Sequence, residues 1–151
     1  TAAVNLGPTL RARTEIVGGS GDFVAEFAFP EPDPPPVTTI AWRMGHLWML
    51  FAQRNASHFG RDPISYESAD YPGDPRAALC KIDEEYARWM KGVAELDPEG
   101  LAKEVGPAEG PYAEYPYAAL VLHINREAIH HGAEIACIRD LYAHTNNKKG
   151  N

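Results

Sequence analysis

The sequence has few cysteines, few basic residues and no long apolar run, and each shortage excludes a class of protein. Its 151 residues include 2 cysteines, Cys80 and Cys137, and they do not form the CxxC spacing of a redox or zinc-knuckle motif. We expect both to be small, reduced core residues. The 14 Lys+Arg against 21 Asp+Glu give a net charge of -7, which would repel a phosphate backbone. Nucleic acid is therefore excluded as a partner.

The absence of a long apolar run also argues against a membrane protein. The longest run, near residues 47–52, is far shorter than the roughly 20 residues that a membrane-spanning helix requires. The first residues have neither a basic start nor the apolar core of a signal peptide. We therefore expect a cytoplasmic protein without a membrane partner. Its length suits one domain with a single core, so residues 1–151 are predicted to form a single domain.

Three segments show the spacing of long amphipathic helices, at about residues 38–58, 74–95 and 116–144. Thr38 or Thr39 offers an N-cap hydroxyl for the first, which Gly60 ends. Asp74 followed by Pro75 supplies the cap and the first-turn proline of the second. With no convincing strand, the pattern predicts an all-α fold, most simply a helix bundle.

The lead-in, residues 1–36, shows no sustained helical period, and "PEPDPPP" at residues 30–36 is expected to be a stiff connector. A four-helix bundle would close the core better than three helices. The missing first helix is either unrecognised in the lead-in or lies upstream of Thr1. A homodimer is a third arrangement that would cover the gap.

Two polar residues interrupt the apolar stripe of the last predicted helix. Glu127 and His131 are four residues apart, so their side chains lie on one face, in line with the apolar positions. A buried carboxylate must be paired, protonated or bound to a cation. The stripe that they complete consists of Tyr117, Leu120, Val121, Ile124, Ala128, Ile135, Ile138, Leu141 and Tyr142.

His46 lies midway along the first predicted helix among apolar residues and is expected to face inward. Two imidazoles and one carboxylate form a ligand set that holds a divalent metal and leaves positions open for water or substrate. Other readings of the pattern exist. Glu127 and His131 alone would form a buried ion pair, His46 would suit a hydrogen-bonded core position, and His123 and His130 compete as ligands.

At these residues the chain resembles the DinB-like superfamily of metal-binding four-helix bundles, which includes mycothiol-dependent maleylpyruvate isomerases and bacillithiol transferases. The similar segments are "TTIAWRMGHL", which contains His46, and "NREAIHHGAEIACIRDLY", which contains Glu127 and His131. The resemblance covers roughly residues 30–143 and implies an up-down-down-up bundle whose first helix is poorly recognisable here or absent. Many members supply three histidines, and Glu127 stands where the second would fall, as in the isomerase branch. The resemblance thus implies His46, Glu127 and His131 as metal ligands.

The resemblance also implies a chemistry. A divalent metal, with zinc expected first and nickel or iron as alternatives, would ionise a low-molecular-weight thiol such as mycothiol for transfer to, or isomerisation of, an electrophile. A metal-dependent hydrolase and a non-catalytic, stress-associated metal-binding bundle are the alternatives. By helical spacing, we expect the polar neighbours of the site to be Arg54, Asn55, Arg126, His130 and Glu134.

Overall fold

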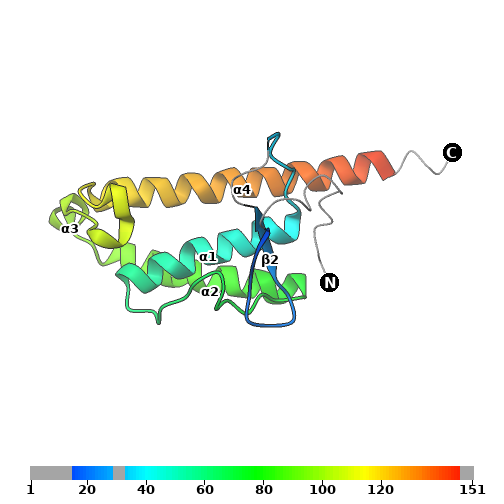
Figure 1. The fold of residues 1–151 in the computed structure, drawn as a ribbon. Coiled ribbons are helices and arrows are strands. Elements are labelled where there is room, and N and C mark those ends of the chain that lie inside the picture. Colours follow the sequence, from blue (N-terminus) through cyan, green and yellow to red (C-terminus); the bar gives the residue numbers. More distant parts are fainter. Residues whose placement is uncertain (1–14, 29–32, 147–151) are drawn as a thin grey trace. The chain divides into compact units, whose positions relative to one another are not determined.

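A computed structural model describes residues 15–28 and 33–146, and the chain divides into two units, Thr1–Gly92 and Val93–Asn151. In the described part, the first unit holds the strands β1 (Glu15–Gly18) and β2 (Ala25–Ala28) and the helices α1 (Ile40–His58) and α2 (Pro75–Ala94). The second unit holds α3 (Pro98–Ala102), the 3-10 helix η1 (Pro107–Tyr112) and α4 (Tyr117–Asn146). The fold is all-α apart from one hairpin, as the sequence predicts (Figure 1).

The ends of the long helices follow from local capping. Thr39 accepts a hydrogen bond from the backbone N–H of Trp42 at 3.1 Å and starts α1, and Asp74 accepts one from Ala77 at 3.1 Å at the start of α2. After α1, Gly60 adopts a positive φ of 69°, which favours glycine. The structure therefore places all three helices within two residues of the predicted ends.

One short hairpin accompanies the helices, although the sequence pattern indicates no convincing strand. β1 and β2 pair in antiparallel register, with Glu15 opposite Ala28 and Gly18 opposite Ala25. The glycine-rich turn makes the reversal possible, since Gly19 has a φ of 146° that other residues rarely adopt. Ser20 in the turn donates from its backbone N–H to the carbonyl of Ala69 at 2.8 Å, which fixes the hairpin to the segment before α2. A first bundle helix was expected in the lead-in or upstream of Thr1. Residues 15–28 of the lead-in form the hairpin instead, and residues 1–14 and 29–32 lie outside the described residues.

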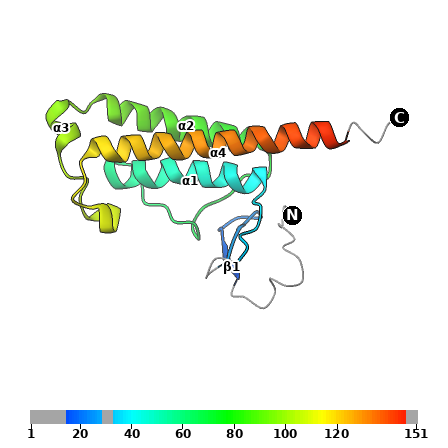
Figure 2. The same ribbon diagram turned by 90° about the horizontal axis from the view of Figure 1, so that it is seen from above.

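α1 and α2 run in the same direction, and the segment between them, residues 59–74, returns along the pair (Figures 1 and 2). A buried polar network joins the two helices. The Asn55 side-chain amide donates to the backbone carbonyl and to the carboxylate of Glu85, both at 2.8 Å, and the same carboxylate is paired with Arg61. Asn55 is fully buried, so these bonds satisfy its side-chain N–H groups, which would otherwise be costly to bury.

The apolar core of the first unit lies where α1 is buried on all sides. Every residue from Leu47 to Ala52 is buried, and Trp48, Met49 and Ala52 form a cluster with Ala69 and Tyr71. Trp89 is the fully buried anchor of α2, with its ring 5.4 Å from that of Phe59. Such contacts account for most of the apolar burial that stabilises a helical core.

Some apolar residues of α2 and both cysteines are exposed. On α2, Leu79, Tyr86 and Met90 are exposed, because the buried face of this helix runs through Glu85, Trp89 and Gly92 instead. Cys80 and Cys137 are both exposed, so the expectation of buried cysteines is wrong. Their helices turn these two positions toward the exposed side.

In the second unit, the residues that precede α4 form a compact start. Tyr117 donates its backbone N–H to the carbonyl of Lys103 at 2.9 Å, and Glu104 forms an isolated antiparallel β-bridge with Pro116. Leu120 and Ile124 of the predicted stripe are buried, but Leu141 and Tyr142 are 59% and 71% exposed. The stripe therefore ends earlier than predicted, because all residues from Arg139 to Thr145 are exposed.

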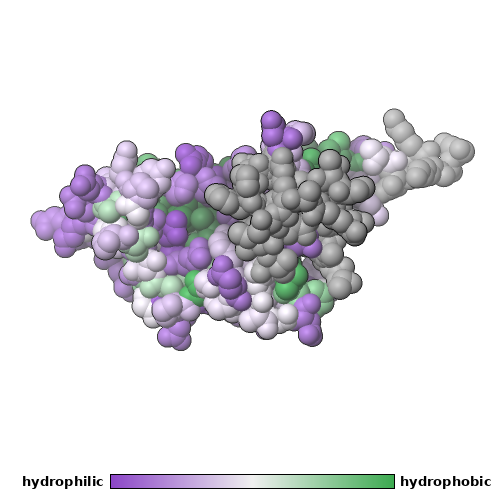
Figure 3. All heavy atoms as spheres, in the orientation of Figure 1, coloured by the Kyte–Doolittle hydropathy of each residue, from purple (hydrophilic) through white to green (hydrophobic). Residues whose placement is uncertain are grey.

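None of the described helices combines the length and the apolar character that crossing a lipid bilayer requires. The face drawn in Figure 3 instead mixes hydrophilic residues with small apolar areas.

Candidate metal centre

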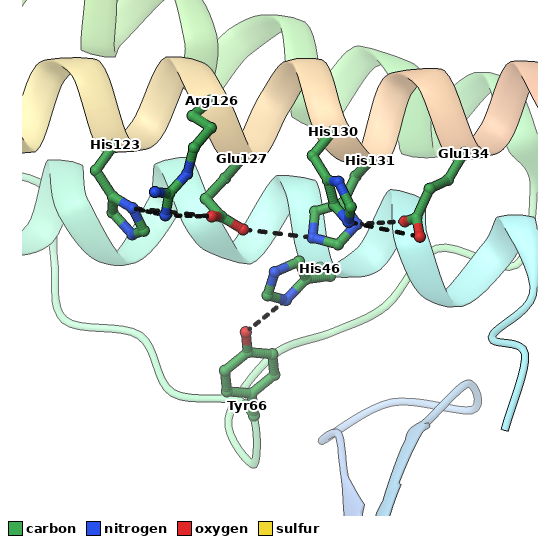
Figure 4. A network of polar contacts seen from close by, with 8 residues as sticks. All are labelled: His46, Tyr66, His123, Arg126, Glu127, His130, His131 and Glu134. Atoms are coloured by element: carbon green, nitrogen blue, oxygen red, sulfur yellow. Dashed lines mark hydrogen bonds and ion pairs between the residues drawn. The ribbon is translucent and has the colours of Figure 1, made fainter. Parts of the chain in front are cut away.

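One face of α4 carries a row of ionisable side chains (Figure 4). Nε2 of His131 lies 3.6 Å from Oε2 of Glu127, one turn earlier, and Nδ1 of His131 lies 2.9 Å from Oε2 of Glu134, one turn later. The structure therefore brings Glu127 and His131 together, as the i, i+4 spacing predicts. The side chain of His131 is 14% exposed, which makes it the most sheltered of the α4 histidines in this row.

The two carboxylate oxygens of Glu127 have different partners. Oε1 accepts a hydrogen bond from Arg126 at 3.1 Å and lies 3.8 Å from Nδ1 of His123, while Oε2 faces His131. Partial burial acts to raise the pKa of Glu127, but the hydrogen bond from Arg126 and the charges of His123, Arg126 and His131 outweigh it and lower that pKa. The carboxylate is therefore ionised at neutral pH, and Oε2 is the oxygen directed at the imidazole.

Glu134 orients the ring of His131. An ionised carboxylate only accepts hydrogen bonds, so Nδ1 of His131 is the donor in this contact, and Nε2 is the ring nitrogen on the side of Glu127. His130 approaches the other oxygen of Glu134 at 3.5 Å, but its side chain is 61% exposed. The ligand atoms of His130, His131 and Glu134 lie within 4.8 Å of one another, so they form a second potential ligand group on the same helix.

His46 belongs to the first unit, and its participation as a third ligand stays a prediction. Its Nδ1 lies 3.1 Å from the hydroxyl of Tyr66, and its ring stacks on Trp42 with centroids 5.3 Å apart and planes at 11°. Burial raises the pKa of Tyr66, against the opposing charge of Arg54, so its hydroxyl stays protonated at neutral pH. When Nδ1–H of His46 donates to Tyr66, Nε2 is the ring nitrogen left without a proton.

The expected polar neighbours of the site differ in their roles. Arg126, His130 and Glu134 lie beside the Glu127 and His131 pair, as same-helix spacing predicts. Asn55 is instead bound to Glu85 between α1 and α2. Spacing along the sequence missed Tyr66 because it lies 20 residues from His46, in the segment between helices.

These observations define a class of protein: a helical protein with His and Glu side chains grouped as potential metal ligands. A family model described as the DinB superfamily matches residues 12–135, which is most of the chain. The chain belongs to the DinB superfamily. No match was found among curated proteins, and none among solved structures.

Proposed function

We propose that the chain binds a divalent metal ion through His46, Glu127 and His131 and uses it to activate a low-molecular-weight thiol of the mycothiol type in a transfer or isomerisation reaction. The observation that carries the proposal is the contact between Nε2 of His131 and Oε2 of Glu127 in a member of the DinB superfamily. Zinc is the metal that we expect first, with nickel and iron as alternatives.

The donor atoms suit such an ion. Glu127 supplies an ionised oxygen because its pKa is lowered, and the Glu134 contact directs Nε2 of His131 toward it. Nδ1 of His46 likewise has an oxygen partner, which is the hydroxyl of Tyr66. Hydrogen-bonded partners of this kind fix the tautomer of ligating histidines and raise their basicity.

A bound divalent ion would supply a Lewis acid that keeps a thiol or a water molecule ionised at neutral pH. The residues of the chain perform the remaining tasks. Glu127 contributes one negative charge, and Arg126 neutralises part of it through its hydrogen bond to Oε1. With three protein ligands, the ion keeps a position for an exogenous ligand, as catalytic sites of this kind do.

The choice of a thiol over water rests on the resemblance to the isomerase branch, in which Glu replaces the second histidine. The partners are then a small thiol and a small electrophile. A hydrolase that uses water at the same site is the competing function, and a non-catalytic metal-binding protein is the third.

Elemental analysis of the purified protein, followed by Co(II) substitution, tests the site. We expect about one ion per chain and its loss in His46→Ala, with His130→Ala as the control because that neighbouring histidine is largely exposed. Retention of the metal in His46→Ala together with its loss in His130→Ala would assign the ion to the group of His130, His131 and Glu134 and overturn the proposed ligand set.

Titration of the Co(II) protein with small thiols tests the chemistry. A new sulfur-to-metal charge-transfer band and a perturbed d–d spectrum are the expected result. An unchanged spectrum, combined with hydrolysis of activated esters that depends on Glu127, would favour the hydrolase instead.

A further inference from the structure

The first unit contains a cavity of about 390 Å³ between the hairpin, the first turns of α1 and the start of α2. The hairpin contributes residues 22–26, α1 and its cap contribute residues from 39 to 48, and the third wall comes from residues 71–75 and Ala78. This volume lies in the range of sites that hold small organic ligands. Every residue of the lining belongs to one unit, so the cavity is a feature of that unit alone.

The walls of the cavity are mainly apolar and include the four aromatic rings of Phe23, Trp42, Trp48 and Tyr71. Three of these rings make contacts that hold them in place. The indole N–H of Trp42 donates to the backbone carbonyl of Glu26 at 3.0 Å, and Trp48 meets Tyr71 edge to face at 5.6 Å. A wall of fixed rings favours a flat apolar ligand, which stacks against them without reorganising the site.

The charged residues that line the cavity are all acidic, and the nearby ammonium of Lys81, 4.3 Å from the centroid of the Trp48 ring, is not part of the lining. Asp22, Glu26 and Asp74 belong to its lining, and among the described residues that line it there is no Lys, Arg or His. Asp74 lies at the start of α2, where its carboxylate accepts the hydrogen bond from the backbone N–H of Ala77. The chain as a whole carries a charge of -7. An anionic ligand would therefore enter against like charge and find no partner.

We propose that this cavity binds an uncharged, apolar molecule that contains an aromatic ring. The cavity also adjoins a proposed metal ligand, because Trp42 lines it and stacks on His46. Its occupant is accordingly the electrophilic substrate of the reaction, an assignment that rests on the proposed function. The substrate class is then an apolar compound rather than an organic acid.

A matched pair of fluorescent probes tests the binding. N-phenyl-1-naphthylamine is uncharged, and 8-anilinonaphthalene-1-sulfonate has the same ring system with one negative charge. We expect the uncharged probe to bind with enhanced fluorescence and the sulfonate to bind at least ten-fold more weakly. Equal affinities would overturn the assignment of ligand charge, and absence of binding of the uncharged probe would overturn the site.

Two substitutions locate the probe. Ala78→Trp places a large ring at a half-buried position in the lining and should weaken binding of the uncharged probe at least ten-fold, whereas Ala77→Trp, at the exposed neighbouring position, should not. Equal effects of the two would place the probe elsewhere. Asp22→Arg, in the exposed turn, should narrow the difference between the two probes without filling the cavity. An unchanged difference would contradict the electrostatic argument.

The same titrations separate this proposal from the proposed function. Binding of the uncharged probe should survive removal of metal by a chelator and the substitution Glu127→Gln, because neither changes the lining. Probe binding without any metal in the purified protein would retain the cavity and refute the metal centre. Metal binding without probe binding would support the metal centre and refute the proposed ligand of the cavity.

Discussion

Nδ1 of His131 lies 2.9 Å from Oε2 of Glu134, one turn further along α4, and this contact determines which nitrogen of the ring faces Glu127. A single carboxylate thereby selects the tautomer that a metal ligand needs. Removal of the Glu134 carboxylate tests this role most directly.

Glu134→Gln should weaken Co(II) binding by about ten-fold, because an amide no longer stabilises the Nδ1–H form of His131 as strongly as a carboxylate does. Titration followed by the d–d absorption measures the affinity, and nitrogen chemical shifts of the metal-free protein report the tautomer of His131. Glu114→Gln makes the same chemical change at an exposed position and serves as the control. An unchanged tautomer and affinity in Glu134→Gln would show that Glu134 does not position His131.

Tyr66→Phe should weaken Co(II) binding by a comparable factor of about ten, because it removes the oxygen partner of His46 at Nδ1. Tyr112→Phe removes a hydroxyl from an exposed tyrosine and should leave the affinity unchanged. If both variants bound Co(II) like the parent protein, the Tyr66 contact would have no role in metal binding.

Stability should fall as the pH rises above about 10. Burial raises the pKa of Tyr66 and, more strongly, that of Tyr71, where the charges of Tyr66 and Glu67 add to the effect. The unfolded chain releases these phenol protons near the ordinary value of 10, while the folded chain still holds them, so the free energy of unfolding decreases with pH above that value.

Urea denaturation of the parent protein and of Tyr71→Phe at pH 8 and at pH 10.5 measures this dependence. Tyr71→Phe should lose less stability between the two pH values than the parent protein, whereas the exposed Tyr112→Phe should behave like the parent. At pH 8 Tyr71→Phe should stay within about 1 kcal/mol of the parent, because the buried hydroxyl of Tyr71 has no hydrogen-bond partner among the described residues. Identical pH slopes in all three proteins would contradict the prediction.

Asn55→Ala should destabilise the protein by about 1–3 kcal/mol, because it removes both hydrogen bonds to Glu85 and leaves that buried carboxylate with fewer partners. Asn125→Ala, on the exposed side of α4, is the matched control and should change stability by less than about 0.5 kcal/mol. Thermal and urea unfolding provide the comparison. A loss no larger in Asn55→Ala than in the control would mean that the network does not hold α1 to α2.

The three long helices were predictable from their helical spacing, and both ends of α1 and the start of α2 are also encoded locally, by Thr39, Gly60 and Asp74. The hairpin was not, since its strands are four residues each and too short to show a convincing alternation. Their pairing depends on the glycine-rich turn and on the bond from Ser20 to Ala69, which no local pattern reveals.

In the candidate site, too, contacts within one helix were predictable from the sequence and contacts between distant segments were not. The approach of Glu127 and Glu134 to His131 follows from helical geometry, so sequence spacing sufficed to predict it. Tyr66 and the pairing of Asn55 with Glu85 depend on contacts between segments 20 and 30 residues apart. Hydrogen-bonding groups at such separations carry no periodic signal, and Asn55 was therefore expected near the site instead of between the helices.

The exposed cysteines provide a direct way to follow the proposed metal binding. Cys80 lies on α2 in one unit and Cys137 on α4 in the other, so each unit carries one exposed thiol, and these are the 2 cysteines of the sequence. Nitroxide spin labels attached to both would yield a distance distribution by pulsed dipolar spectroscopy without any engineered substitution. An ion coordinated jointly by His46, Glu127 and His131 should narrow that distribution on addition of Zn(II).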